Sequence, residues 1–186
     1  MPADKPVSFA GEYAQRASQW SDVQYCMPWM LDTATGYDQP AILELGVRSG
    51  NSTSAFLAAA EASGGHVWSM DTEPPEVPPH WADSGLWTFV QGDDLKADWA
   101  GHEFDVIFID TSHRYDHTLA ELRKYVPLAA RGGSVLLHDT LLAHVDYEPR
   151  PYPVTLALAA FCDETHRGWT EHGGRTGFAE IVCPNG

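Results

Sequence analysis

Four acidic residues could do chemistry together, because each ends an apolar run that predicts a buried strand. They are Glu44, Asp71, Asp110 and Asp139. The carboxyl ends of parallel strands share one edge of a sheet, so these side chains should converge there although they are far apart in sequence. A single acid at such a place is often only a turn residue. Four acids on one edge, with a glycine-punctuated loop among them, indicate a ligand site.

Two histidines stand beside these acids in the sequence. His113 follows Asp110 by three residues, and His138 immediately precedes Asp139. An imidazole near carboxylates can act as a general acid or base, or can join them in binding a divalent cation. Each histidine could instead be structural, His113 at a helix start and His138 at a strand end. We favour a functional role for His113 and have no preference for His138.

The loop among the acids belongs to a predicted strand–turn–helix unit. Residues 41–45 predict a buried strand, residues 46–50 predict a turn, and a helix with a Ser or Thr cap begins near Ser52. Gly46 and Gly50 would let the backbone approach a ligand, and the helix N-terminus would offer N–H groups to a carboxylate or phosphate. The next strand, residues 66–70, closes on Asp71, which could accept hydrogen bonds from ribose hydroxyls or only shape a turn.

Further strands are predicted at residues 86–90, 104–109 and 134–137. Asp93 and Asp94 follow the first of these, where one could meet an adenine amino group or both could cap a short helix over residues 95–99. Residues 111–126 predict a helix with His117 in its first turn on a surface face, so His117 and the loop residue His144 are weaker candidates. A helix from residue 152 and a hairpin of residues 168–171 and 177–182 follow.

This order of elements predicts one α/β domain over residues 1–186. Its sheet should be doubly wound and Rossmann-like, mostly parallel with a C-terminal antiparallel hairpin, and covered by helices on both faces. Residues 41–183 form the predicted core. Residues 1–38 predict an aromatic-rich helical lead-in, with Phe9, Tyr13 and Trp20 near helical spacing and a second helix capped by Ser21 or Asp22. The lead-in could pack on the core or act as a lid.

Composition narrows the classes of partner. The 186 residues carry a net charge of −15, which repels nucleic acid and anionic membrane surfaces and leaves a small molecule as the expected partner. The three cysteines lack metal or disulfide spacing, and no secretory signal or membrane span is evident, so we predict a cytoplasmic location. Exposed aromatics and the closing hairpin leave room for a homo-oligomer.

Several stretches together resemble class I S-adenosylmethionine-dependent methyltransferases. They are ELGVRSGNST, the acid at Asp71, GDD, IDTSHRYDHTLAELRKY and GGSVLLHDT. The closer resemblance is to a small bacterial branch that includes macrolide sugar O-methyltransferases and cephalosporin-hydroxylase-like proteins, and it covers residues 41–140. A nicotinamide cofactor fits less well, because the loop is GxxxG and lacks the middle glycine of GxGxxG.

The resemblance implies a set of cofactor contacts. Residues around the first loop would hold the methionine portion of the cofactor: Glu44, Gly46, Ser49, Gly50, Asn51 and Ser52. Asp71 would take the ribose hydroxyls, and Asp93 or Asp94 would lie near the adenine. In metal-dependent relatives, acids at the positions of Asp110 and Asp139 bind a divalent cation such as Mg or Mn, and a histidine at the position of His113 is the base.

The chain departs from this pattern beside its second acid. Relatives carry an acid just before Asp139 or an amide just after it, whereas this chain has His138 and Thr140. His138 as a metal ligand would favour Mn, Fe or Zn over Mg. The sequence therefore leaves a metal-assisted and a metal-free site both open.

The predicted function is methyl transfer from S-adenosylmethionine to a hydroxyl of a small sugar-like or natural-product-like metabolite. Asp110, His113 and Asp139 would surround the acceptor oxygen. One alternative is a metal-dependent oxygenase or hydrolase on the same fold, with Asp110, His113 and either His138 or Asp139 as ligands. Another is a binding protein that holds the cofactor without catalysis.

Overall fold

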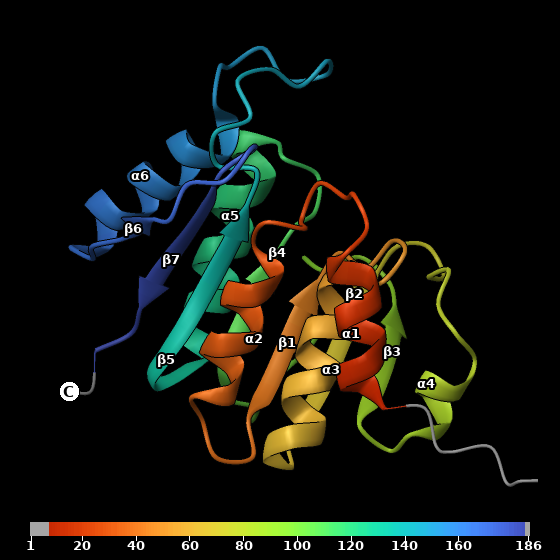
Figure 1. Cartoon of the computed structure of the whole chain (residues 1–186). Coiled ribbons are helices and arrows are strands. Elements are labelled where there is room, and N and C mark those ends of the chain that lie inside the picture. Colours follow the sequence, from red (N-terminus) through yellow and green to blue (C-terminus); the bar gives the residue numbers. More distant parts are fainter. Residues whose placement is uncertain (1–7, 185–186) are drawn as a thin grey trace, which may run out of the picture.

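The computed structural model describes residues 8–184, so the prediction of no N-terminal signal falls partly outside the described residues. Within that range, one sheet runs in the order β3-β2-β1-β4-β5-β7-β6 (Figure 1). Its strands are β1 (Ala41–Leu45), β2 (His66–Asp71), β3 (Trp87–Gln91), β4 (Phe104–Ile109), β5 (Ala129–His138), β6 (Thr170–Glu171) and β7 (Phe178–Val182). The first five are parallel, and β6 and β7 form an antiparallel hairpin against β5. The predicted fold class is confirmed.

Helices cover both faces of this sheet (Figure 1). They are α1 (Phe9–Ala17), α2 (Met27–Thr35), α3 (Asn51–Ser63), α4 (His80–Asp83), α5 (Tyr115–Tyr125) and α6 (Pro153–Thr165). Successive side chains of a strand point to opposite faces, so the apolar runs divide between two cores. Ile42 packs with α2 and α3 on one face, and Leu43 packs with α5 and α6 on the other. Among the described helices, none is long and apolar enough to cross a bilayer.

Three local predictions were wrong. Ser21 and Asp22 do not cap α2, which begins at Met27 after Cys26. Residues 95–99 form no helix. The Asp93 and Asp94 carboxylates both accept the Leu95 N–H, which closes a turn at residues 94–96. The N-cap of α3 is Gly50 in the left-handed region, with no Ser or Thr side-chain cap.

The lead-in helices pack on the core, as one of the two interpretations predicted. Phe9, Met27 and Met30 are buried against α3. Trp20 follows α1 and is 74% exposed, so it lies outside this packing. The segment between α1 and α2 borders the carboxyl edge of the sheet, beside Gly46 and Asp110. Its Trp20 side chain faces solvent.

Candidate active site

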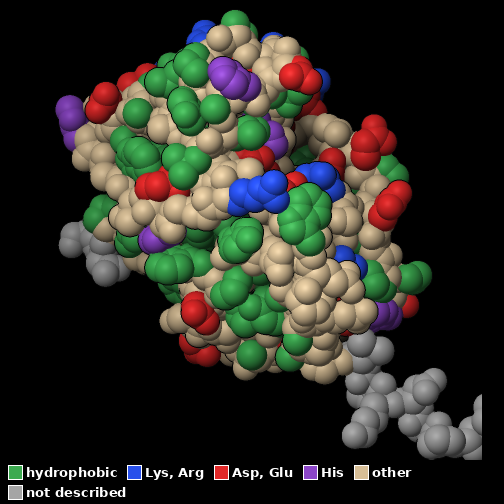
Figure 2. Space-filling model, turned by 45° about the horizontal axis from the view of Figure 1, so that its top comes forward, with side chains coloured by type: hydrophobic (Ala, Val, Ile, Leu, Met, Phe, Trp, Pro, Cys, Tyr) green, Lys and Arg blue, Asp and Glu red, His purple; other side chains and the backbone are tan. Residues whose placement is uncertain are grey.

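Two adjoining cavities, each of about 260 Å³, open at the carboxyl ends of the parallel strands. Gly46, Arg48 and Asp110 line both. Asp71, Asp94 and His117 line the first cavity, and Ser49, Asn51 and Ser52 line the second with the Trp20–Val23 segment. Figure 2 turns this side forward and shows acidic and basic side chains along its hollowed edge.

The first loop approaches β4 so closely that only glycine fits at its start. Gly46 has a φ of +91°, and a Cβ there would lie 2.0 Å from the carbonyl oxygen of Asp110. The Gly46 N–H donates to the Met70 carbonyl, and the Asp110 N–H donates to the Leu45 carbonyl. The ends of β1, β2 and β4 are thereby joined under both cavities.

Asp71 fixes the same loop from the side of β2. Its Oδ2 accepts hydrogen bonds from the backbone N–H groups of Val47, at 2.8 Å, and Arg48, at 3.2 Å. Its Oδ1 accepts from the Glu73 N–H at 3.2 Å. Each carboxylate oxygen can accept more than one hydrogen bond, so Asp71 retains acceptor capacity toward the first cavity. Its contact with ribose hydroxyls stays a prediction.

Glu44 is buried beneath the loop. Its carboxylate accepts hydrogen bonds from the hydroxyls of Ser52, Thr53 and Ser69 at 2.6 to 2.7 Å. Burial raises the pKa of Glu44 to about 7, although the three hydroxyls oppose the shift. Glu44 lines neither cavity. It ties the first turn of α3 to β1 and β2, and so holds Ser52 at the second cavity.

The remaining loop residues divide between cavity and packing. Arg16 of α1 donates to the Ser49 carbonyl at 2.8 Å and to Asn51 Oδ1 at 3.2 Å, which fixes two residues of the second cavity. Gly50 packs against Val77 and Trp81 and lines neither cavity. Asp93 also lines neither, and its side chain is 40% exposed beside Lys96.

An acid and histidine cluster lies at Asp110, which lines both cavities. His113 Nε2 lies 3.0 Å from Asp110 Oδ1 and 3.0 Å from Asp139 Oδ2. His138 Nδ1 lies 3.4 Å from Asp110 Oδ1 and 3.3 Å from Asp139 Oδ1, while its Nε2 is 3.1 Å from the Thr176 hydroxyl. The predicted catalytic residues Asp110, His113 and Asp139 are thus brought together.

Opposite charges in this cluster shift the pKa values of Asp110, His113 and His138. Burial alone would raise the pKa of Asp110, but the hydrogen bond of His113 and the charges of His113 and His138 hold it well below its usual range. Burial would lower the pKa of both imidazoles. The hydrogen bond and charge of Asp110, with the charge of Asp139, instead raise the pKa of His113. The close contacts of His138 with the same two acids raise its pKa to about 11. The acids therefore favour the protonated form of both imidazoles.

The backbone of this cluster is strained. His113 has a φ of +53° and Asp139 a φ of +58°, in the left-handed region that side chains disfavour. Such conformations cost about 1 to 3 kcal/mol each and persist only where the surroundings fix them. The two strained residues contact each other, and His113 also contacts Asp110. This supports a site in which the direction of the side chains matters more than local stability.

The donor set fits a divalent cation. One ligand atom from each of Asp110, His113 and Asp139 lies within 4.8 Å of the others. His138 Nδ1 and Asp139 Oδ1 are buried, yet neither makes a well-formed hydrogen bond within residues 8–184. Carboxylate oxygens are the ligands that Mg²⁺ and Mn²⁺ prefer. Asp110 and Asp139 could hold such an ion, and ligation by His138 stays a prediction.

Several residues at this edge of the sheet were either not predicted from the sequence or were weaker candidates there. His117 lies in the cavity wall and not on an exposed helix face. Arg48 lines both cavities, and Trp20 lines the second. Glu121, one turn after His117 on α5, is fully buried beside it. The i, i+4 spacing of His117 and Glu121 was the available signal, because such residues share one helix face.

Known proteins that resemble this chain include methyltransferases. A family profile described as "Methyltransferase domain" matches residues 43–140. No curated protein matches the chain significantly by sequence. Solved structures with the same fold include a methyltransferase from Podospora anserina with bound S-adenosylhomocysteine, at 17% identity and a TM-score of 0.67, over 96% of this chain and 88% of that one.

Two neighbours come from natural-product biosynthesis. A TDP-rhamnose 3'-O-methyltransferase of calicheamicin biosynthesis is 17% identical, with a TM-score of 0.62 over 85% of this chain and 77% of that one. A methyltransferase of the mycinamycin pathway, in complex with Mg, S-adenosylhomocysteine and mycinamycin VI, is 18% identical with a TM-score of 0.69. It is matched over 98% of this chain and 56% of that one.

Proposed function

This chain belongs to the class I S-adenosylmethionine-dependent methyltransferases, and we propose that it methylates a hydroxyl group of a small metabolite. The observation that carries the proposal is the contact of His113 Nε2, at 3.0 Å, with both Asp110 and Asp139. Asp110 lines both cavities, whereas His113 and Asp139 lie behind it and line neither. Neighbours of the same fold include an O-methyltransferase of a nucleotide sugar and one in complex with a macrolide, which supports a hydroxylated natural-product-like acceptor.

The first cavity suits the adenosine of the cofactor, and the second suits its methionine portion. When bound, S-adenosylmethionine supplies a methyl group on a positively charged sulfur. Asp71 would orient the ribose, while Ser49, Asn51 and Ser52 would position the methionine end. The chain contributes rate mainly by holding the acceptor oxygen in line with the methyl carbon and sulfur.

His113 would receive the acceptor's proton. A general base works best when its pKa lies near the working pH, yet the two carboxylates raise the pKa of His113. A divalent cation held by Asp110 and Asp139 would supply positive charge that offsets those carboxylates and lowers the pKa of a bound hydroxyl. His113 would then be neutral and able to take the proton. Metal assistance by Mg or Mn is therefore part of the proposal.

The surface charge supports a small acceptor. A net charge of −15 disfavours approach to nucleic acid, which is itself a polyanion. Trp20, 74% exposed beside the second cavity, offers a flat apolar surface for a sugar or ring system. We propose no role for a second copy of the chain in this chemistry.

Calorimetry and a methyl-transfer assay test this function. Wild-type protein should bind S-adenosylhomocysteine and methylate at least one member of a panel of hydroxylated sugars and aglycones in the presence of Mg²⁺. His113→Ala should keep cofactor-product affinity and lose about 10²- to 10⁴-fold in transfer rate. His144→Ala, which removes an exposed histidine of a surface loop, is the matched control and should change neither.

Three outcomes would contradict the proposal. Absence of S-adenosylhomocysteine binding would remove its premise, and stoichiometric iron in such a protein would favour an oxygenase or hydrolase. Cofactor binding without transfer to any acceptor would favour a binding protein. Full transfer activity in His113→Ala would show that His113 is not the base.

A further inference from the structure

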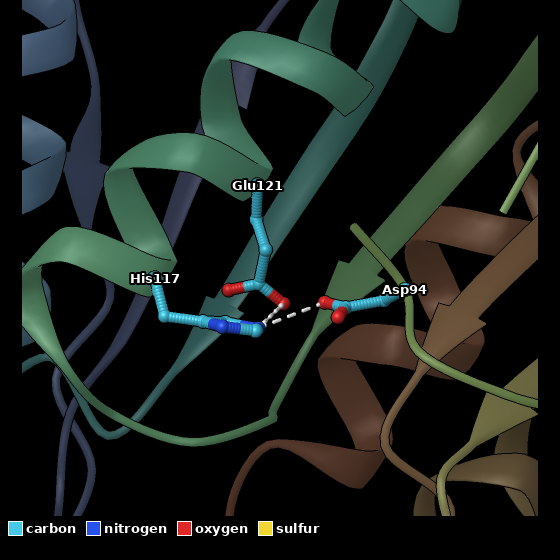
Figure 3. A group of neighbouring side chains, drawn as sticks. All are labelled: Asp94, His117 and Glu121. Atoms are coloured by element: carbon cyan, nitrogen blue, oxygen red, sulfur yellow. Dashed lines mark hydrogen bonds and ion pairs between the residues drawn. The ribbon is translucent and has the colours of Figure 1, made fainter. Parts of the chain in front are cut away.

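Helix α5 directs three side chains at a single residue, Asp94, and a fourth at one of those three. His117 Nε2 lies 3.0 Å from Asp94 Oδ2, and Lys124 and Tyr125 each donate to the Asp94 carbonyl oxygen at 2.6 Å. Glu121 Oε1 lies 3.6 Å from the same His117 nitrogen. Figure 3 shows Glu121 and Asp94 pointing at one edge of the His117 ring. Asp94 is therefore fixed in both its side chain and its backbone by α5.

Asp94 and His117 are both part of the wall of the first cavity, together with Asp71 at the end of β2. Asp94 is 8% exposed, whereas its neighbour Asp93 turns toward Lys96 and solvent. Of Asp93 and Asp94, only Asp94 therefore lines the first cavity. A residue that only ended β3 would not need three hydrogen-bonding partners from a distant helix.

The charges of the group keep Asp94 ionised. Burial alone would raise its pKa, but the hydrogen bond and charge of His117 lower it to about 2. Hydrogen bonds to Asp94 and Glu121 raise the pKa of His117 to about 10. Glu121 is fully buried, with Oε1 accepting from the Thr111 hydroxyl at 2.7 Å and Oε2 without a partner in the described chain. Burial raises the pKa of Glu121 to about 7, so of the two carboxyl groups beside His117, Glu121 is the one that takes up a proton more readily.

We propose that His117 is a positioning residue that makes the first cavity specific for adenine, by holding the Asp94 carboxylate as the hydrogen-bond acceptor for the 6-amino group. The inference rests on the proposed function, which places adenosine in this cavity. An ionised carboxylate accepts from an amino group but presents only lone pairs to the 6-oxo group of hypoxanthine. A protonated Asp94 could donate to that oxygen and would tolerate both bases. The His117 contact at 3.0 Å favours the acceptor form and so the choice of adenine.

Paired calorimetric titrations with S-adenosylhomocysteine and its 6-oxo analogue, S-inosylhomocysteine, test the inference at pH 7. Wild-type protein should prefer the adenosyl ligand by about tenfold or more, because the 6-amino group donates a hydrogen bond to a charged acceptor and the 6-oxo group cannot. His117→Leu should reduce the preference to about threefold or less, and His117→Gln, which keeps an N–H donor, should restore part of it. Asp94→Asn, whose amide can donate to the 6-oxo group, should remove or reverse it.

Asp116→Asn is the matched control on the same helix, since its side chain is 79% exposed, and it should retain the wild-type preference. A merely structural His117 predicts equal loss of affinity for both ligands in His117→Leu and His117→Gln, with an unchanged ratio, and that result overturns the inference. Equal binding of both ligands by wild-type protein overturns it while leaving the proposed function intact. Failure of wild-type protein to bind either ligand overturns both. Stoichiometric transition metal that is lost in His117→Gln would make the three residues a metal site and overturn it as well.

Discussion

Replacement of Gly46 by alanine should weaken both the fold and the cofactor site, because two separate costs fall on this residue. Its φ of +91° is costly for any L side chain, by about 1 to 2 kcal/mol. A Cβ would also stand 2.0 Å from the Asp110 carbonyl oxygen, a backbone atom that cannot rotate away. Forced overpacking of this kind costs about 1 to 3 kcal/mol.

Gly85→Ala separates these costs. Gly85 has a φ of +74° and nothing within 4 Å of the added Cβ, so alanine there meets the conformational cost alone. One kcal/mol lowers Tm by about 2 to 4 °C in a chain of this size. Gly85→Ala should therefore lower Tm by about 2 to 8 °C, and Gly46→Ala should lower it clearly further.

Thermal unfolding and calorimetry with S-adenosylhomocysteine provide the measurement. Gly46→Ala should also lose affinity for the ligand, because relief of the collision must move the loop or Asp110, which line both cavities. Gly85→Ala should bind normally. Equal loss of Tm in the two variants, or normal ligand affinity in Gly46→Ala, would refute the close approach of the loop to β4 as the reason for this glycine.

Two further predictions concern ionisable residues. Because burial raises the pKa of Glu44 from about 4.5 to about 7, its contribution to stability is complete below about pH 4.5 and is lost as the pH rises through 7. Glu44→Gln should flatten the fall of the unfolding free energy between pH 5 and 8, by on the order of 3 kcal/mol, and denaturant titrations with parallel pH curves for the two proteins would contradict this. Mg²⁺ or Mn²⁺ at about 100 times its Kd should stabilise wild-type protein by about 2.7 kcal/mol and raise its Tm accordingly. The same cation concentration should raise the Tm of Asp139→Asn much less. Equal rises in Tm would argue against a cation at Asp139.

The sheet was predictable because its strands are nearly continuous apolar runs. Residues 104–109 are buried on both faces, as such a run indicates, and the βαβ unit around Gly46 follows from the strand, the glycines and the helix pattern. Strand ends then follow from topology, so Asp71 and Asp110 could be placed on one edge without knowing a single distance. The hairpin could be recognised from its glycines and alternating apolar residues.

The failures have a common physical cause, since long-range polar contacts outweighed local preference. Ser52 was expected near a cap, but its hydroxyl donates to buried Glu44, and an unpaired carboxylate there would cost more than a missing cap. The helix pattern places only apolar residues on the buried face, so His117 and Glu121, which are polar, are both predicted to face solvent. In the structure Glu121 is buried, and His117 lies beside it. Asp94 could not be separated from Asp93 until α5 was known to pack over it.

The segment that begins α5 joins the two halves of the site. His113 lies two residues before the helix in a strained conformation and contacts the acid cluster. His117 lies in the first turn and contacts Asp94 in the wall of the first cavity, where adenine is proposed to bind. A displacement of α5 would therefore move the proposed base and the proposed specificity residue together. A misplacement of about 1 Å can reduce a rate about a hundredfold. On the proposed function, the hydrogen bonds from Lys124 and Tyr125 to Asp94 would therefore protect methyl transfer as well as the choice of cofactor.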